Sequence, residues 1–289
     1  MKLVTFNCRG RISIGKVVGN LVIDLAASDS ALPKSMLELL QAGPAAMGRV
    51  RAVEAAKAVT YPLSDVRLEP PVPNPSKFLA IGMNYQKHAQ EARDLGIQVP
   101  EFQVWFNKQV SCVNGPFDPV HIPRASDKVD YEAELAVVIG RRCRHVSIEE
   151  ASSVVAGYMI CNDVSVRDWQ SRTPTMTLGK SFNTHGPIGP WLVTPEEVGD
   201  PHALNMRMLV NGEIKQEAST SELIYNIWEQ IAYLSTVMTL EPGDILATGT
   251  PSGVGVALKP PQFRKVGDVM RVEIDGIGHI ENVCIAEPI

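Results

Sequence analysis

The chain has 289 residues, a formal net charge of −5 at pH 7 and a hydrophobic fraction of 45%. This length allows one large domain, or one domain with a small appendage, and an ample buried core. The acidic balance argues against a nucleic-acid-binding protein, which needs a basic surface. The five cysteines are odd in number and lack Cys-x-x-Cys spacing, which predicts free thiols in a reducing compartment.

Two sequence features bear on localisation. The chain has no apolar run of about 18 residues, the length that a membrane-spanning helix requires. Its N-terminal segment also lacks the apolar stretch of a secretory signal peptide. We therefore expect a cytoplasmic protein that binds neither membranes nor nucleic acids.

The first 70 residues have the patterns of short strands followed by helices. Alternation of apolar and polar residues predicts strands over residues 2–8, 12–18 and 21–25. The turn residues Gly19-Asn20 favour a hairpin between the last two strands. Apolar residues at helical spacing predict helices over residues 34–41 and 44–58.

A proline-rich stretch follows this first segment. Four prolines lie between residues 69 and 75, which predicts an extended linker. We place a domain boundary there. The prediction is a small N-terminal α+β domain over residues 1–70 and a catalytic domain over residues 71–289.

The rest of the chain has mostly strand-like runs. These runs cover residues 77–81, 131–140, 154–162, 191–194, 205–210, 245–248 and 270–274. Ser147 and Glu150 form a capping-box pattern that predicts a helix to about residue 155. Ser221 is predicted to cap a longer helix that ends before Pro242. Many strands and few helices predict an α+β fold, mostly β with α, whose catalytic domain is a mixed β-barrel or roll.

Two carboxylates stand at the start of one strand-like run. Glu132 and Glu134 are two positions apart, so in a strand they project from the same face. A second apolar run ends in a third acid, Asp163. Like charges this close repel unless a cation lies between them, and three carboxylates suit a hard ion such as Mg²⁺ or Mn²⁺. The alternative is that Glu132 and Glu134 line the wet face of an edge strand.

A histidine and a glutamate follow the first strand of the larger segment. His88 and Glu91 are three residues apart, so on a helix they share a face and can hydrogen-bond. A carboxylate beside an imidazole fixes its tautomer and raises its basicity, which suits deprotonation of a water molecule. The alternative is an exposed helix with incidental polar residues. The polar segment over residues 92–103 has the composition of a mobile lid.

The segment with His88 and Glu91 is followed by four motifs in a fixed order. These are Glu132-x-Glu134, Asn162-Asp163-Val164-Ser165-Val166-Arg167-Asp168-Trp169-Gln170, Gly179-Lys180-Ser181-Phe182 and Thr248-Gly249-Thr250-Pro251-Ser252-Gly253-Val254-Gly255. From about Lys77 to the C-terminus the chain resembles the fumarylacetoacetate hydrolase family, especially its bacterial two-domain members. The resemblance implies a β-rich barrel or roll with a divalent metal at its mouth, and a homodimer.

The resemblance also implies roles for individual residues. Glu132, Glu134 and Asp163 match the metal ligands. Animal fumarylacetoacetases use a further aspartate upstream as a fourth ligand, whereas here Asn107 and Lys108 stand where the chain passes the site. If the three acids converge only for the ion, Glu132→Gln or Asp163→Asn should relieve repulsion in the metal-free protein and so should not lower its melting temperature.

The remaining matches concern catalysis and substrate binding. His88 and Glu91 match the water-activating dyad, and Lys180 matches the lysine that stabilises developing negative charge. The other matched positions lie around the substrate and are Arg167, Gln170, Gly249 and Thr250. Thr250 and the Gly249 backbone match the loop that holds the oxyanion or carboxylate end of the substrate.

These parts together predict a Mg²⁺-dependent hydrolase that also accepts Mn²⁺. We expect it to cleave the C–C bond of an acylpyruvate or another 2,4-diketo acid, with release of pyruvate and a carboxylic acid. The alternative is a decarboxylase of oxaloacetate, or an isomerase or decarboxylase of a 2-hydroxydienoate, because both use the same enolate chemistry. A third reading is a binding protein that keeps the fold without turnover.

Overall fold

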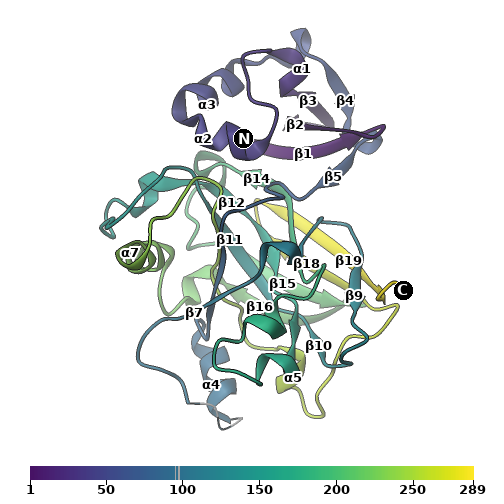
Figure 1. Cartoon of the computed structure of the whole chain (residues 1–289), viewed down its shortest axis with the longest axis vertical. Coiled ribbons are helices and arrows are strands. Elements are labelled where there is room, and N and C mark those ends of the chain that lie inside the picture. The colour runs from purple at the N-terminus through teal and green to yellow at the C-terminus, as the bar shows by residue number, and fades with distance from the viewer. Residues whose placement is uncertain (95, 97) are drawn as a thin grey trace.

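The computed structural model describes residues 1–94, 96 and 98–289. Two residues of the expected lid segment, Leu95 and Ile97, lie outside the described residues. Figure 1 shows the first 70 residues as a unit at one end of a longer body, which the rest of the chain forms. Strand β5 ends at Glu69 and β6 begins at Phe78, so the proline-rich stretch connects the two parts. The domain boundary there stays a prediction.

The N-terminal unit contains five strands and three short helices. The strands are β1 (Lys2–Cys8), β2 (Arg11–Val18), β3 (Leu21–Asp24), β4 (Thr60–Pro62) and β5 (Arg67–Glu69). The helices are α1 (Leu25–Ser28), α2 (Met36–Gln41) and α3 (Gly43–Ala52). Helix α3 ends six residues earlier than the helix predicted over residues 44–58. The buried ammonium of Lys16 donates to the carbonyl oxygens of Val50 (2.9 Å) and Val53 (2.8 Å), which stabilises this earlier end.

A long mixed sheet runs from this unit into the larger body. Its further strands are β6 (Phe78–Gly82), β7 (Val104–Asn107), β8 (Val113–Asn114), β11 (Ala133–Ile139), β12 (Val155–Asn162), β14 (Gly186–Val193) and β17 (Ile245–Ala247). The main order is β4-β3-β2-β1-β14-β12-β11-β17-β6-β7. Strand β1 pairs antiparallel with β14, with Lys2 opposite Val193, so the first and second parts of the chain share one sheet.

A second sheet packs against the first across the main core. It contains β16 (Glu213–Ser219), β15 (Asn205–Val210), β18 (Val269–Ile274), β19 (Gly278–Ala286) and β9 (Val120–Ile122), in this order. Leu135 and Val137 of β11 pack in this core with Met208 of β15, whereas Ala136 faces the opposite side. This alternation is the two-residue period of a strand that is buried on both faces. The mostly β, α+β fold predicted from the sequence is confirmed.

The helices of the larger body are short and lie at its edges. They are α4 (Gln86–Asp94), α5 (Arg167–Gln170), α6 (Pro195–Val198) and α7 (Ile227–Val237), and a two-stranded ladder joins β10 (Val129–Asp130) to β13 (Ser165–Val166). The predicted cap at Ser221 is wrong, because Asn226 caps α7 and accepts from the amides of Trp228 and Glu229. Ser219 instead caps a 3₁₀ turn at Thr220–Glu222.

The helix predicted from Ser147 is also wrong. Residues 148–150 form a turn and Ala151–Val154 a single 3₁₀ turn, after which the chain enters β12. The Ser147 hydroxyl accepts from the amide of Glu150 (3.3 Å), so the cap forms at its expected place. Because β12 must begin at Val155, there is no room for a longer helix.

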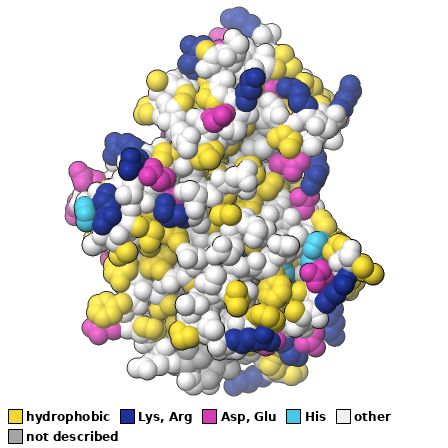
Figure 2. All heavy atoms as spheres, in the orientation of Figure 1, with side chains coloured by type: hydrophobic (Ala, Val, Ile, Leu, Met, Phe, Trp, Pro, Cys, Tyr) yellow, Lys and Arg dark blue, Asp and Glu magenta, His cyan; other side chains and the backbone are white. Residues whose placement is uncertain are grey.

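Among the described residues, no helix is both long and apolar enough to cross a membrane. On the face drawn in Figure 2, basic and acidic side chains are interspersed and hydrophobic ones gather near α7. Tyr233 and Val237 of α7 are among the exposed apolar residues.

Candidate active site

The predicted site residues meet at one edge of the long sheet. Antiparallel β11 and β12 place the start of one strand beside the end of the other, with Ala133 opposite Asn162. Strands β17 and β6 run parallel, so their carboxyl ends reach the same edge and lead into the loop at Gly249 and into α4. In Figure 1 this edge lies at the lower end of the body, between α4 and α5. A cavity of about 670 Å³ opens there.

The three carboxylates predicted to hold a metal lie together, and one of them, Glu132, lines this cavity. One oxygen from each of Glu132, Glu134 and Asp163 lies within 4.8 Å of the others, and all three side chains are buried. The amide of Asp163 donates to the carbonyl of Glu132 (2.9 Å), and the Asn162 side chain accepts from the amide of Glu132 (3.1 Å). These bonds lock the two chain segments that carry the acids. The edge-strand alternative is therefore excluded, because the acids are not on a wet face.

Lys180 and Arg167 supply positive charge to Glu132. The Lys180 ammonium lies 2.7 Å from an oxygen of Glu132 and 2.7 Å from an oxygen of Asp163. The Arg167 guanidinium lies 2.6 Å from the other oxygen of Glu132. Burial by itself raises the pKa of Glu132, but the attraction of Lys180 and Arg167 outweighs it and lowers that pKa below its usual range.

Lys108 is a second buried ammonium at the site. Its Nζ lies 2.6 Å from Asp163 Oδ1 and donates to the carbonyl oxygen of Lys180 (2.5 Å). Burial lowers the pKa of Lys108, but Asp163 raises it by more, so the pKa stays above its ordinary value and the group is charged. A lysine thus stands where a fourth acidic ligand was sought in the sequence. Nothing in the local sequence indicates this contact, because Lys108 follows the edge strand β7.

Glu134 differs from the other two acids because no cation contacts it directly. One of its oxygens accepts from the amide of Gly249 (2.8 Å), and the other has no hydrogen-bond partner within the described part of the chain. Burial, together with the negative charges of Asp163 and Glu132, raises the pKa of Glu134 well above its usual range. An orphaned, buried oxygen beside two further carboxylates fits a hard divalent cation, which takes oxygen ligands. The donor set therefore fits Mg²⁺ or Mn²⁺.

The His88–Glu91 contact predicted from the spacing is confirmed. Both residues lie on α4, and His88 Nδ1 is 3.1 Å from Glu91 Oε2. The second oxygen of Glu91 accepts from the amide of Gly253 (2.9 Å), so the carboxylate is held from two sides. With Nδ1 engaged by Glu91, the Nε2 atom of His88 is the ring nitrogen left to exchange a proton. Both side chains line the cavity.

Arg167 and Gln170 occupy one turn of α5 and act as a pair. Arg167 donates to Gln170 (2.9 Å) and to Asp130 (2.8 Å), a buried acid that also accepts from the amides of Gly255 (2.8 Å) and Val256 (2.9 Å). The remaining guanidinium nitrogen, Nη2, has no partner among the described residues. This nitrogen is itself buried, whereas the Arg167 side chain as a whole lines the cavity and brings positive charge to it.

In the Gly249–Thr250 loop, the Gly249 amide has a different partner from the one that the resemblance implies. The Gly249 amide donates to Glu134, so it orients a predicted metal ligand and is not available to an oxyanion. Gly249 has φ +104°, and a Cβ there would lie 2.7 Å from Asn84 Cβ, so only glycine fits. The Thr250 hydroxyl lines the cavity and accepts from Gln216 (2.9 Å), whose carbonyl oxygen accepts from the amide of Ala133 (3.0 Å).

The backbone of α5 packs so closely against residue 179 that only glycine fits before Lys180. A Cβ on Gly179 would lie 2.2 Å from the backbone nitrogen of Gln170. We expect Gly179→Ala to push α5 away from Lys180, which lowers stability by about 1–3 kcal/mol, as overpacking does, and lowers activity as well. Gly48→Ala is the matched control, because a Cβ at Gly48 in α3 meets nothing within 4 Å. Melting curves and activity assays of both variants test this, and equal melting temperatures would contradict it.

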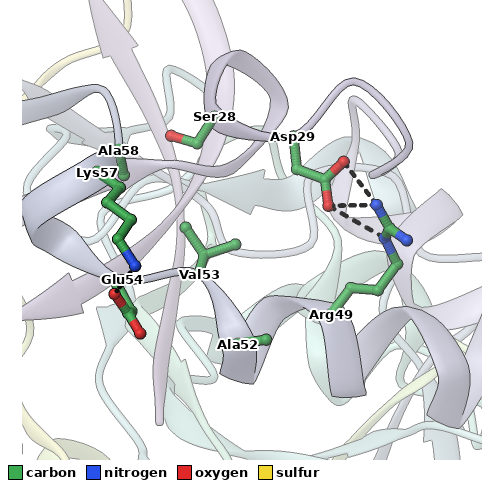
Figure 3. Close-up of a pocket in the computed structure, with 8 residues that line it drawn as sticks. All are labelled: Ser28, Asp29, Arg49, Ala52, Val53, Glu54, Lys57 and Ala58. Carbon is green, nitrogen blue, oxygen red and sulfur yellow. Dashed lines mark hydrogen bonds and ion pairs between the residues drawn. The ribbon is translucent and has the colours of Figure 1, made fainter.

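A hollow in the N-terminal unit offers a contrast with the cavity. Figure 3 shows Arg49 and Asp29 pointing toward each other across this hollow of about 460 Å³, with two nitrogen–oxygen contacts to Asp29 Oδ2 of 3.0 and 2.7 Å. Lys57 likewise pairs with Glu54 (2.8 Å). The charged groups of this hollow therefore neutralise one another, and none of the predicted site residues lines the hollow. The catalytic candidate is the cavity beside α4.

Comparison with known proteins agrees with the motifs. The family model "Fumarylacetoacetate (FAA) hydrolase C-terminal" matches residues 77–285. The mitochondrial oxaloacetate tautomerase of Xenopus laevis is 41% identical over 99% of this chain and 90% of its own length.

Solved structures extend the comparison to the fold. A maleylpyruvate hydrolase from Sphingobium sp. SYK-6, in complex with manganese(II) and pyruvate, has a TM-score of 0.83, 35% identity and full coverage of both chains. A fumarylacetoacetate hydrolase from Exiguobacterium antarcticum has a TM-score of 0.85 and 35% identity, over 99% of this chain and 100% of that one. The site geometry, the family match and these relatives lead to one conclusion: the chain belongs to the fumarylacetoacetate hydrolase family.

Proposed function

We propose that the protein is a divalent-metal-dependent enzyme that interconverts the keto and enol forms of oxaloacetate or a closely related 2-oxo acid. The observation that carries this proposal is that His88, Glu91 and Glu132 line one cavity, and that Glu132 belongs to a buried triad of carboxylates. The relative from Xenopus laevis, similar over almost the whole chain, supports oxaloacetate as the substrate.

Glu132, Glu134 and Asp163 would hold the metal. We propose Mg²⁺, with Mn²⁺ also accepted, because an oxygen-only donor set discriminates little between them. Bound there, the metal supplies Lewis-acid chemistry that lowers the free energy of an enolate. The manganese-containing maleylpyruvate hydrolase supports a divalent ion at this place.

The protein's own groups then bind the substrate and move the proton. Arg167 attracts a carboxylate of the substrate, since its cationic side chain lines the cavity. His88 Nε2 exchanges a proton with C3 of the 2-oxo acid, while Glu91 holds Nδ1 and stabilises the imidazolium that forms. The proton on the enol oxygen is exchanged with water. The Lys180 ammonium, held between two carboxylates, stabilises negative charge on the enolate oxygen.

Acylpyruvate hydrolysis is the second candidate function. The specific observation that favours it is the double anchoring of Glu91, by His88 and by the amide of Gly253, which fixes the orientation of an imidazole that can accept a proton from water. The water would attack the C4 carbonyl, and Lys180 would stabilise the tetrahedral oxyanion, a role worth about 3–4 kcal/mol of the barrier. Collapse would release a carboxylic acid and the enolate of pyruvate.

A panel assay tests the proposal. Purified protein is stripped with a chelator, reloaded with Mg²⁺ or Mn²⁺ and assayed for three reactions: ketonisation of enol-oxaloacetate, decarboxylation of oxaloacetate and hydrolysis of acylpyruvates. We expect metal-dependent ketonisation with the highest kcat/KM. Metal-dependent hydrolysis faster than ketonisation would make the second candidate the principal activity. No metal-dependent turnover in any of the three assays would refute both.

A further inference from the structure

The cavity is larger and less polar than oxaloacetate requires. Its volume of about 670 Å³ lies within the range of pockets that bind drug-sized ligands, about 300–1,000 Å³. Oxaloacetate is a four-carbon dicarboxylate that offers no apolar surface to bury. Apolar side chains nevertheless line much of this space, and they are Ile81, Met83, Ala92, Phe106, Pro174, Met176, Val254, Val256 and Ala257.

Contacts connect this apolar wall directly to the polar centre. The Lys180 ammonium lies 4.9 Å from the centroid of the Phe106 ring, so the wall begins beside the predicted oxyanion site. On the other side, the side-chain amide of Gln170 donates to the sulfur of Met176 (3.7 Å), and Gln170 also accepts from Arg167. A substrate held by Lys180 and Arg167 would therefore extend its far end along this wall.

Two methionines of this wall have an unusual backbone. Six non-glycine residues in the described part of the chain have positive φ, and two of them, Met83 (56°) and Met176 (58°), line the cavity. The left-handed conformation is unfavourable for such side chains, and such strain concentrates at functional sites. Both side chains are half-buried, and methionine adapts its shape to irregular apolar ligands.

We propose that this wall is a subsite for an apolar acyl chain and that Met83 and Met176 determine its specificity. The ligand class is a 2-oxo acid with a carbonyl at C4 and an unbranched aliphatic chain beyond it, a longer acylpyruvate. This inference rests on the proposed enolate chemistry of the site and extends it to substrates larger than oxaloacetate. Each methylene buried on the wall strengthens binding of the transition state by the hydrophobic effect.

A chain-length series measures the subsite. The series runs from acetylpyruvate through butyrylpyruvate to hexanoylpyruvate. We expect kcat/KM for turnover of these acylpyruvates by the Mg²⁺-loaded enzyme to rise about fourfold per methylene, the usual effect of burying one methylene. Affinities of unreactive 2-oxo acids, from pyruvate through 2-oxopentanoate to 2-oxooctanoate, are measured by calorimetry on the same preparation. They should follow a similar slope.

Substitutions test whether Met83 and Met176 cause the increase in kcat/KM and affinity with chain length. Glutamine matches methionine in length and lacks β-branching, so Met83→Gln and Met176→Gln change polarity with little change in shape. We expect each to reduce the slope in both series to less than twofold per methylene. Leu178→Gln is the matched control, because Leu178 belongs to the same loop as Met176 but is exposed and does not line the cavity. This control should keep the wild-type slope.

The possible outcomes distinguish failure of the proposed subsite from failure of the proposed function. A flat wild-type series in both measurements, with turnover of oxaloacetate, would overturn the subsite and leave the proposed function standing. A binding slope without any metal-dependent turnover would support the subsite and refute the proposed function. A wild-type slope that survives both glutamine substitutions would overturn the assignment to Met83 and Met176.

Discussion

His88→Ala is expected to slow enol-oxaloacetate ketonisation and acylpyruvate hydrolysis by about 10²–10⁴-fold, the usual contribution of general acid–base catalysis. Both reactions need a proton moved by a positioned base, and Nε2 of His88 is the ring nitrogen free to do so. Decarboxylation of oxaloacetate should fall much less, because loss of CO₂ from the 2-oxo acid needs no base. The three rates are measured on one preparation at saturating Mg²⁺. Glu91→Gln should give the same pattern more weakly, because Glu91 only orients and charges the imidazole.

The control for this variant is His145→Asn. His145 is exposed and has φ +54°, a conformation that asparagine tolerates, so this substitution should change none of the three rates. If His88→Ala slows all three reactions equally, His88 has a role in substrate binding and is not the base. Lys180→Met gives a further contrast. It should impair all three reactions, because each develops negative charge beside the ammonium.

Strands with strong local alternation could be predicted from the sequence. The strands predicted over residues 2–8 and 205–210 have the bounds of β1 and β15, since apolar and polar residues alternate there. Strand β16 was not predictable in this way. It is the polar edge strand of its sheet, and its pairing with β15 supplies the order that its own sequence does not indicate.

The candidate site was predictable where its residues are close in the sequence. The spacing of Glu132 and Glu134 and of His88 and Glu91 indicates a shared face directly, and the family motifs supply Asp163. Gln216 was not predictable, because it contacts the amide of Ala133 across 83 positions of sequence. Contacts of this kind depend on how the two sheets pack, and a local sequence pattern does not indicate that packing. The same is true of Lys108, which reaches Asp163 from the edge strand.

Charge neighbours divide the three acids into two kinds. Asp163 lies between the ammonium groups of Lys108 and Lys180, and Glu132 contacts Lys180 and Arg167. Glu134 contacts neither lysine nor arginine directly, and one of its oxygens is unpaired in the described structure. The premise that Glu132 and Asp163 converge only for the ion is therefore wrong, and neutralising either is expected to lower the melting temperature. Removing one partner of a buried ion pair leaves an uncompensated charge, which costs about 3–5 kcal/mol.

We expect opposite effects on the metal-free protein from two isosteric substitutions. Asp163→Asn should lower the melting temperature, because Lys108 and Lys180 lose a buried counter-ion. Glu134→Gln should raise it, because the variant folds without the cost of protonating Glu134 or of holding its charge beside Asp163 and Glu132. Both variants should lose the stabilisation by Mg²⁺, which for one site is about 2.7 kcal/mol when Mg²⁺ is at about 100 times its Kd. Melting curves with and without Mg²⁺, and calorimetric Mg²⁺ affinities, provide the test.

The pH dependence gives this prediction a second readout. The folded-state pKa of Glu134 is raised, so its carboxyl keeps a proton in the folded protein that the unfolded chain has already lost. Metal-free wild type should therefore lose stability as pH rises from the ordinary carboxyl pKa through the raised one, whereas Glu134→Gln should not. The advantage of the variant should be absent at low pH and widen over this window. Wild-type Mg²⁺ affinity in Glu134→Gln would contradict its role as a ligand. A melting temperature below that of wild type throughout the window would contradict the charge argument.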